Sequence, residues 1–420
     1  MRNHRGVAGS AAPARPSEAD HVAVRVVRQP VFNADEEPVG NRVRAVEDAS
    51  GSTGGYLAAM PQGTDAELVL AEELHALAPR GLVFLSVSRR ELLERRALFL
   101  PHERVVLCLP ATEHLDDDLR DAIDRHAMRG FRLALDAVDL AAVDATLLDR
   151  AHAVVVEVGA SSSHQLAAFV VAARERVSSL ELVAGGVDSR RSFQTCRRLG
   201  FDLFQGQFFL RPTDGPVRTV AAAGPGGIGT MADLAATDNF ERLAAIITRD
   251  PGLSMRLLRY ANSAHVALPR RVGSVHEALA WLGTVAVREF ALIAAVANVP
   301  GAPGEMLATA LTRARMCRQL SRMLRATNPE ESFTVGLFSV AEAVANSPIE
   351  VVVGELPLRE DIASALIRGE GELGRLLTAV VAYERGEAAS AATLIGDPGL
   401  IAEIYLDSIR WADSAVEAVG

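Results

Sequence analysis

Residues 180–212 read LELVAGGVDSRRSFQTCRRLGFDLFQGQFFLRP and hold the pattern that decides the fold. Two short runs rich in apolar residues, LELVAG at 180–185 and DLFQGQF at 202–208, enclose an arginine-rich stretch. Short apolar runs separated by a longer amphipathic stretch are typical of two parallel strands joined by a helix. The segment therefore predicts one β/α unit.

The same alternation extends toward the N-terminus, from about residue 23 to residue 210. The further predicted strands are VAVRVVR (22–28), LVFLSVS (82–88), RVVLCLP (104–110), RLALDA (132–137) and AVVVEV (153–158). Amphipathic stretches at 66–77 and 115–130 predict helices between them. The simplest closure of such a series is a β/α barrel, complete or incomplete.

The second half of the chain has a different pattern. A stretch rich in Gly, Pro and Ala at 213–230 predicts a linker. Beyond it, apolar residues recur at helical spacing and no series of strands is visible. We therefore expect an α/β plus all-α protein, with a flexible tail at 1–21, a barrel at 22–212, the linker, and a helical domain at 231–420.

Composition excludes several functions. The 420 residues carry 43 basic and 53 acidic side chains, a net charge of −10, which argues against direct binding of nucleic acid. Every basic side chain except histidine is arginine, so lysine Schiff bases and phosphate-loop lysines are excluded. This arginine-rich, alanine-rich composition indicates a bacterial genome of high GC content.

The chain shows no sign of export or of a membrane span. Three widely spaced cysteines indicate neither a disulfide framework nor a zinc site, and no long apolar run follows the polar N-terminus. We expect a cytoplasmic protein.

Two segments of the first half resemble the EAL domain, the family of cyclic-di-GMP (c-di-GMP) phosphodiesterases. RQPVF at 28–32 is similar to the opening strand of EAL domains joined to HDOD domains, and AGGVD at 184–188 is similar to the AEGVE motif. The resemblance implies a barrel whose strand ends hold two metal ions with a cluster of carboxylates.

This sequence departs from that pattern at most of the metal-binding positions. Arg42 stands where the first glutamate belongs, and Gly185 where another belongs. Ser86 and Cys108 replace two further ligands, and of the paired aspartates only Asp136 remains. The lysine implied by the family would fall near Val156 or Glu157, in a chain without lysine. We therefore predict no catalytic residue, no metal and no cofactor.

The residues that survive define a candidate ligand pocket. They are Arg28, Gln29, Arg42, Asp136, Asp188 and Gln205. The interpretation we favour is a catalytically inactive adaptor that is no enzyme and acts through protein–protein contacts. The first alternative is a non-hydrolysing c-di-GMP receptor whose barrel gates the helical domain, and the second is an active phosphodiesterase.

The second half resembles the HDOD domain. The motif residues are Asp250, Pro251, Asn262, Ser263, Leu282 and Gly283. Asp250 and Pro251 suit a helix start, and Asn262 and Ser263 suit a helix end, so we expect structural roles for them. The two histidines of this half, His265 and His276, are not followed by Asp, so the metal site of HD phosphohydrolases is absent. We expect an unidentified protein partner and allow a homo-oligomer.

Overall fold

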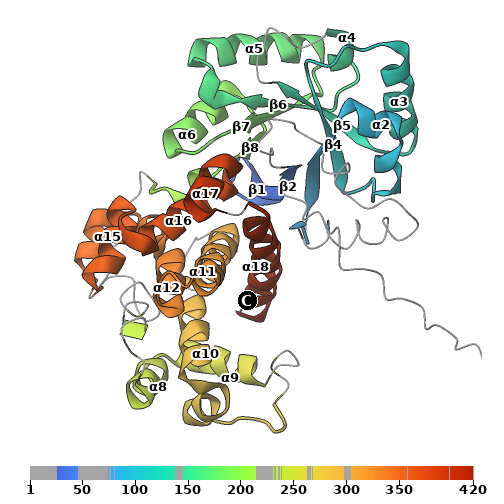
Figure 1. Cartoon of the computed structure of the whole chain (residues 1–420). Helices are drawn as coiled ribbons and strands as arrows, with labels where there is room; N and C mark the ends of the chain where they lie inside the picture. The colour runs from blue at the N-terminus through green and yellow to red at the C-terminus, as the bar shows by residue number, and fades with distance from the viewer. Residues whose placement is uncertain are drawn as a thin grey trace, which may run out of the picture.

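A closed barrel of eight strands forms the first half of the computed structural model (Figure 1). The strands are β1 (Val26–Asn33), β2 (Pro38–Ala45), β3 (Leu82–Ser86), β4 (Val105–Pro110), β5 (Arg132–Ala137), β6 (Ala153–Glu157), β7 (Glu181–Gly185) and β8 (Leu203–Gln205). The structure describes residues 26–45, 74, 77–79, 81–137, 145–213, 230, 233–234, 237, 239–262, 266, 268–297, 304–356, 358–396 and 398–419. The predicted tail, most of the predicted linker and most of the helix predicted at 66–77 lie outside these residues.

Strand direction divides the barrel into two parts. β1 pairs antiparallel with both β2 and β8, whereas β2 to β8 run parallel to one another. The predicted β/α barrel is therefore confirmed, and it is complete. β2 was not among the predicted strands, because its sequence PVGNRVRA carries Gly, Asn and two arginines. Arg42 is buried because it contacts Asp136 and Gln205 across the closed barrel, and Asn41 is buried on the outer face of β2.

Helices connect the parallel strands on the outside of the barrel (Figure 1). They are α2 (Arg89–Leu93), α3 (Asp117–Met128), α4 (Ala145–Leu148), α5 (Ser163–Arg176) and α6 (Arg190–Leu199), with short 3-10 turns at Arg96–Phe99, Val158–Ala160 and Phe208–Leu210. α3 starts where Asp116 accepts a hydrogen bond from the Leu119 backbone, which satisfies a free N–H of its first turn. This outer ring shares one continuous apolar core with the helical second half.

The inside of the barrel holds a separate apolar core. Its side chains are Val31, Phe84, Val106, Cys108, Ala134, Ala153, Val155, Val183 and Leu203. They come from alternate positions of the strands, as the period of two residues requires. The barrel is therefore filled in its middle, and only its ends are open to polar chemistry.

The second half is helical, as predicted. Its helices are α8 (Phe240–Thr248), α9 (Pro251–Ala261), α10 (Val275–Ala297), α11 (Gly304–Leu324), α12 (Pro329–Phe338), α13 (Ala341–Ala345), α14 (Ile349–Gly354), α15 (Glu360–Arg368), α16 (Gly371–Glu384), α17 (Ala388–Ile395) and α18 (Pro398–Val419). α10 contains a break at Gly283, whose φ of 81° lies outside helical geometry. The two predicted helices at 274–283 and 286–299 thus meet at this glycine.

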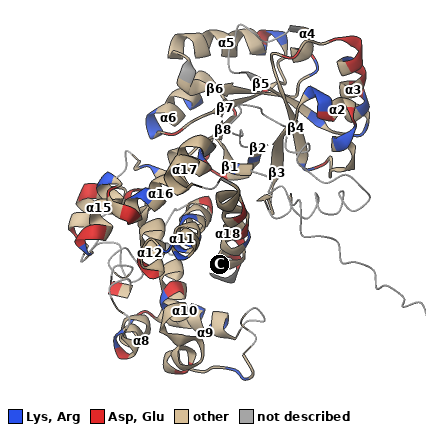
Figure 2. Cartoon of the chain, viewed as in Figure 1, with Lys and Arg blue, Asp and Glu red and all other residues tan. Residues whose placement is uncertain are grey.

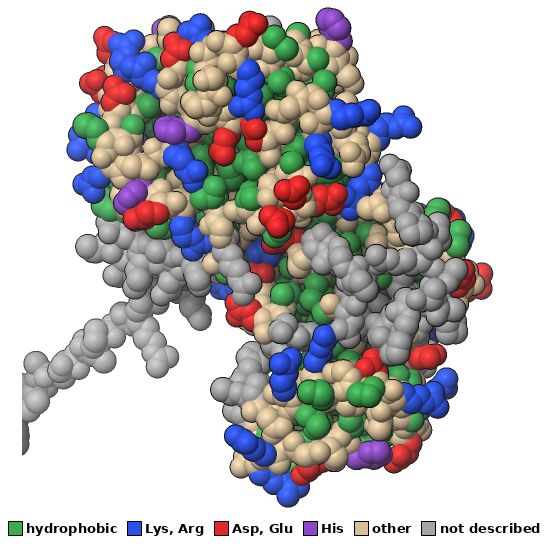
Figure 3. All heavy atoms as spheres, turned by 180° about the vertical axis from the view of Figure 1, so that it is seen from behind, with side chains coloured by type: hydrophobic (Ala, Val, Ile, Leu, Met, Phe, Trp, Pro, Cys, Tyr) green, Lys and Arg blue, Asp and Glu red, His purple; other side chains and the backbone are tan. Residues whose placement is uncertain are grey.

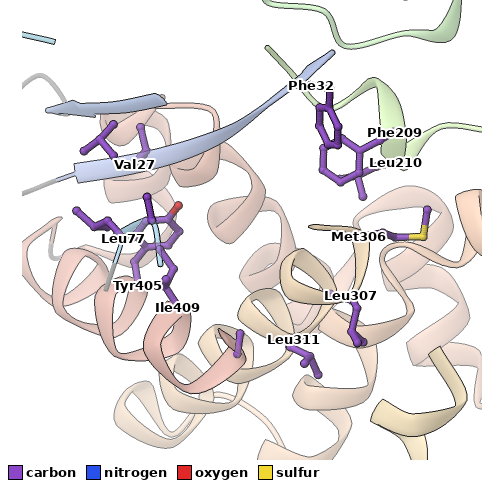
Figure 4. Close-up of a cluster of buried hydrophobic side chains, with 14 of the residues drawn as sticks. Val27, Phe32, Leu77, Phe209, Leu210, Met306, Leu307, Leu311, Tyr405 and Ile409 are labelled. Atoms are coloured by element: carbon purple, nitrogen blue, oxygen red, sulfur yellow. The ribbon is translucent and has the colours of Figure 1, made fainter. Parts of the chain in front are cut away.

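The C-terminal helices cover the outer face of β1. The Tyr383 hydroxyl of α16 donates to the Val26 carbonyl at 3.2 Å, and the Tyr405 hydroxyl of α18 accepts from the Arg28 N–H at 3.1 Å. Figure 4 shows Leu77 beside Tyr405 and Ile409 of α18, next to the strand that carries Val27. The barrel and the helical region are therefore packed through apolar surface as well as hydrogen bonds.

Charge is mixed over the surface. On the face drawn in Figure 3, arginine and acidic side chains alternate over the barrel, as expected for a protein without a broad basic surface. Among the described helices, none combines the length and apolar character that a membrane crossing needs.

Candidate functional site

Polar side chains converge at the carboxyl ends of the parallel strands. The inward residues at this level are Arg42 of β2, Asp136 of β5, Glu157 of β6 and Gln205 of β8, and Gln29 of the antiparallel β1 lies opposite Arg42. Because the parallel strands end on one rim, their last inward side chains can contact one another across the barrel. This group, Gln29, Arg42, Asp136, Glu157 and Gln205, is called the rim cluster below.

Arg42 is the centre of the rim cluster. Its Nη2 donates to Asp136 Oδ2 at 2.6 Å, and its Nη1 donates to Gln205 Oε1 at 3.0 Å and lies 3.8 Å from Glu157 Oε1. Burial lowers the pKa of Arg42, but the charge of Asp136 and of other neighbours outweighs burial, so its net pKa is raised. A guanidinium that stays charged therefore lies between two carboxylates.

The hydrogen bonds continue toward the helical region. Gln205 Nε2 donates to Gln29 Oε1, and Gln29 Nε2 donates to the Glu384 carbonyl of α16 at 3.4 Å. The Glu384 carboxylate in turn pairs with Arg313 of α11 at 2.8 Å, and both side chains are buried. Burial raises the pKa of Glu384, which its ion pair with Arg313 opposes. The rim cluster is thus linked by direct contacts to α16.

Glu157 occupies the space beside Gly185. The two residues are register partners in β6 and β7, and a Cβ added to Gly185 would lie 3.0 Å from Glu157 Oε1. A Cβ added to Gly186 would lie 2.8 Å from Glu157 Oε2. A carboxylate from β6 therefore fills the position next to the glycine that replaces the glutamate of the AEGVE motif.

Three buried polar atoms of the rim find no hydrogen-bond partner among the described residues. They are Arg42 Nε, Asp136 Oδ1 and Ser86 Oγ. Such atoms are rare in folded proteins unless a ligand or solvent meets them. Cys108 lies beside them, but burial and the charge of Asp136 raise the pKa of its thiol, so it stays protonated.

The structure separates the predicted pocket residues into two groups. Gln29, Arg42, Asp136 and Gln205 lie together in the rim cluster, as described above. Arg28 points to the outer face of β1, where its Nη1 and Nη2 donate to Asp413 of α18 at 2.8 and 3.0 Å. Neighbouring residues of a strand face opposite sides, so Arg28 and Gln29 cannot both line the pocket.

Asp188 also makes a contact outside the rim cluster. Its Oδ1 accepts a hydrogen bond from the Gln207 backbone at 3.0 Å, which joins the segments after β7 and β8. Glu157 was missed as a pocket residue, since it was considered only as the position of an absent lysine. Its place at the end of an inward-alternating strand was the signal for it.

The two-metal centre implied by the EAL resemblance does not fit these residues. Within the described part of the chain, no three His, Cys, Asp or Glu side chains are grouped so that they could hold a metal ion. The Arg42 guanidinium takes the place between Asp136 and Glu157, and a cation there repels a second cation. The rim cluster must therefore be interpreted through its own side chains.

The HDOD motif residues have structural contacts. Asp250 accepts from the Leu253 N–H at 3.1 Å and caps α9, with Pro251 at its first position. Asn262 Nδ2 donates to the carbonyls of Leu258 and Val272 at 2.7 and 2.9 Å, and its Oδ1 accepts from the Val272 N–H at 2.8 Å. Ser263 lies outside the described residues.

The last two motif residues belong to α10. Leu282 packs half-buried against the common core, and Gly283 makes the break in the helix. Both positions therefore have a structural role that the sequence pattern indicated.

Known proteins share parts of this architecture. A sequence model described as the HDOD domain matches residues 235–344. A protein of Vibrio cholerae serotype O1 named cyclic di-GMP phosphodiesterase CdgJ is 26% identical over 385 residues, which cover 89% of this chain and 88% of that protein. The chain is an EAL-HDOD protein. A Bacillus subtilis protein, the uncharacterized YuxH, is 25% identical over 246 residues, 57% of this chain and 60% of that one.

Solved structures resemble the barrel of this EAL-HDOD protein only distantly. Klebsiella pneumoniae BlrP1, solved in complexes with c-di-GMP, is 18% identical over 47% of this chain and 58% of its own, with a TM-score of 0.35. An EAL domain protein of Listeria monocytogenes is 12% identical over 44% of this chain and 87% of its own, with a TM-score of 0.34. Scores this low support no conclusion about function.

The full-length comparison corrects our functional interpretation of this EAL-HDOD protein. We expected a catalytically inactive adaptor and no enzyme. That expectation is contradicted, because the relative that aligns along nearly the whole chain is named a c-di-GMP phosphodiesterase. The expectation had rested on the absence of the family's metal ligands from this sequence.

Proposed function

We propose that this protein hydrolyses c-di-GMP at the rim cluster. The observation that carries the proposal is the 26% identity to a named c-di-GMP phosphodiesterase, which extends over 89% of this chain. A similarity of that extent includes the barrel and the helical region together. The carboxyl ends of the strands are also where β/α barrels bind their substrates.

The charges of the rim cluster suit a phosphodiester. A guanidinium offers planar donors that match phosphate oxygens, and Arg42 has an Nε with no partner among the described residues. Arg44 lies one inward position further along β2, where its Nη2 donates to Gln29 Oε1 at 3.4 Å. These two arginines provide the positive charge that would stabilise negative charge on the phosphoryl oxygens as it develops.

Glu157 is the residue we assign as general base. Its side chain is 33% exposed, compared with 19% for Asp136 and 5% for Arg42, so water reaches it most readily. In the proposed step the oxygen of water bonds to phosphorus and Glu157 takes the water proton. The bond from phosphorus to the ribose 3′ oxygen breaks, that oxygen takes a proton from solvent, Glu157 later returns its own proton to solvent, and the linear dinucleotide forms.

The experiment is a product assay with the purified full chain. The protein is incubated with c-di-GMP from pH 6 to pH 9.5, with Mg²⁺, with Mn²⁺ or with EDTA, and the linear dinucleotide is measured by chromatography. We expect turnover that falls by about 100-fold or more in Glu157→Gln, the range for removal of a general base. Glu181→Gln, at the exposed start of β7, is the matched control and should keep wild-type activity.

Two results would contradict the proposal in different ways. Absence of linear product under all conditions would overturn hydrolysis. Turnover that is equal in wild type and Glu157→Gln would leave the activity in place and remove Glu157 as its base.

We place the reaction in the cytoplasm. All three cysteines are buried and unpaired in the structure, as is usual in a reducing compartment.

A further inference from the structure

A cavity lies between the outer face of the barrel and the helical region, apart from the rim cluster. Its volume is about 220 Å³, and its wall combines residues of β2, of the start of α11 and of the end of α18. At about 30 Å³ for each water molecule, it would hold about seven waters. The space therefore suits a small metabolite and is too small for a dinucleotide.

One wall of the cavity carries a buried hydrogen-bond acceptor without a partner. Asn41 lies on the outer face of β2 and is only 4% exposed. Its Oδ1 has no hydrogen-bond partner among the described residues, although it lines this space. A buried amide oxygen left without a donor is unfavourable, so a donor-bearing ligand there would stabilise the site.

The opposite wall carries a carboxylate that forms no direct ion pair with a described residue. The Glu305 side chain of α11 makes no hydrogen bond or ion pair with any described residue. Burial raises its pKa; the charge of Arg28 opposes this effect and that of Asp413 adds to it. A cation placed beside Glu305 would pair with its buried carboxylate and stabilise the ionised form.

The remaining charges of the cavity are also acidic on balance. Among the described residues that line it, Arg28 is the one cation, and both its terminal nitrogens are bonded to Asp413. Glu417 adds another carboxylate. Figure 2 shows acidic residues along α18, the helix that supplies Asp413 and Glu417. An anionic ligand is therefore disfavoured.

We propose that this cavity binds a small organic cation whose ammonium or guanidinium group donates hydrogen bonds to Asn41 and Glu305. Ammonium and guanidinium groups are donors without acceptors, which matches a wall of acceptors. Because the ligand contacts β2 and α11 together, its binding favours the packed arrangement of barrel and helical region.

Agmatine, which carries a guanidinium and an ammonium group on a four-carbon chain, is the probe for this proposal. The full-length protein is titrated with agmatine by calorimetry and by thermal unfolding at pH 7.5. We expect saturable binding and a rise in Tm, with affinity at least tenfold weaker in Glu305→Gln and in Asn41→Ala. Succinate, a dianion of similar length, should not bind, and MgCl2 alone should not reproduce the effect.

A second variant tests the cavity without changing its charge. Ala308 lies on the wall and is 5% exposed, so Ala308→Leu fills the space and should abolish agmatine binding. Glu350→Gln, on an exposed position of α14, is the matched control and should bind as wild type. Circular dichroism establishes that each variant is folded.

The proposal is overturned if agmatine shows no saturable binding. It is also overturned if Glu305→Gln and Ala308→Leu bind as tightly as wild type, or if succinate or MgCl2 gives the same rise in Tm. None of these outcomes bears on c-di-GMP hydrolysis, which is measured at the other side of β2.

Discussion

Glu157 and Gly185 are register partners, and the Glu157 carboxylate occupies the space beside Gly185, where the EAL motif has a glutamate. The side chain of Glu157 crosses from β6 to the space over β7, within 3.0 Å of where a Gly185 Cβ would lie. Any side chain on Gly185 would have to displace it. The loss of a glutamate from β7 and the presence of one on β6 are therefore parts of the same local arrangement.

Alanine substitutions at Gly185 and Gly186 should have different effects on the stability of the protein. In Gly185→Ala the new methyl group would lie 3.0 Å from Glu157 Oε1 and 3.3 Å from Val155 Cγ1. Both neighbours are side-chain atoms that can give way by a few tenths of an ångström, so we expect a small loss of stability. Turnover of c-di-GMP should fall by about 10- to 100-fold, because small displacements of a reacting group are costly. Both quantities are obtained from urea unfolding and the product assay.

Gly186→Ala serves as the comparison for that variant. Its φ of 69° is unfavourable for a residue with a Cβ, so we expect it to lose about 1–2 kcal/mol of stability as well. Equal stability of the two variants would contradict the conformational role of Gly186.

The Arg28–Asp413 ion pair should contribute strongly to the packing of β1 on α18. The side chains are only 8% and 21% exposed, and Arg28 also donates to the Leu77 carbonyl at 3.1 Å. Asp413→Asn leaves a buried guanidinium without its counterion, and we expect a loss of about 3 kcal/mol in the free energy of unfolding.

The exposed pair of Arg315 on α11 and Asp407 on α18 is the control. Asp407 is 53% exposed, so Asp407→Asn should cost about 0.5 kcal/mol. If denaturant unfolding gave similar losses for both substitutions, the Arg28 pair would have no special role at the interface.

Glu305 should make stability depend on pH in a predictable direction. Its pKa in the folded protein is raised above the ordinary value of 4.5 by burial, an effect that Arg28 reduces and Asp413 increases. The ionised form therefore weakens the folded state at neutral pH, and this penalty disappears as pH falls below the ordinary pKa. Glu305→Gln should raise Tm at pH 7.5, and the difference from wild type should shrink toward pH 4.5. If the difference in Tm between Glu305→Gln and wild type grew as the pH fell, the pKa of Glu305 would not be raised in the folded protein.

Asn262 should act as a structural connector of the HDOD domain. It makes three hydrogen bonds, two of them to Val272, ten residues further along the chain. Because the side chain is exposed, we expect Asn262→Ala to cost a modest amount, about 1–2 kcal/mol. Asn262→Asp can still accept from the Val272 N–H but cannot donate, so its unfolding free energy should lie between those of wild type and alanine. If all three proteins had the same free energy of unfolding, the hydrogen bonds of Asn262 would not stabilise the domain.

The sequence by itself determined the kinds of structure present. Alternating apolar runs predicted the parallel strands, helical spacing predicted the second half, and the motif spacings predicted the EAL-HDOD arrangement. Asp250 and Pro251 were recognised as a helix start from local chemistry alone, because a cap contacts residues only three positions away. Arg42 was also named as a pocket residue, but only through the EAL resemblance, because β2 was not predicted as a strand.

The tertiary structure decided which residues act together. Arg28 and Gln29 are neighbours in sequence, yet one pairs with α18 and the other joins the rim cluster, because adjacent residues of a strand face opposite sides. The burial of Asn41 and Arg42 on β2 and the cavity beside Glu305 also depend on contacts between segments far apart in the chain. Such contacts have no local signal where the buried residues are polar, because apolar periodicity then does not mark the buried face.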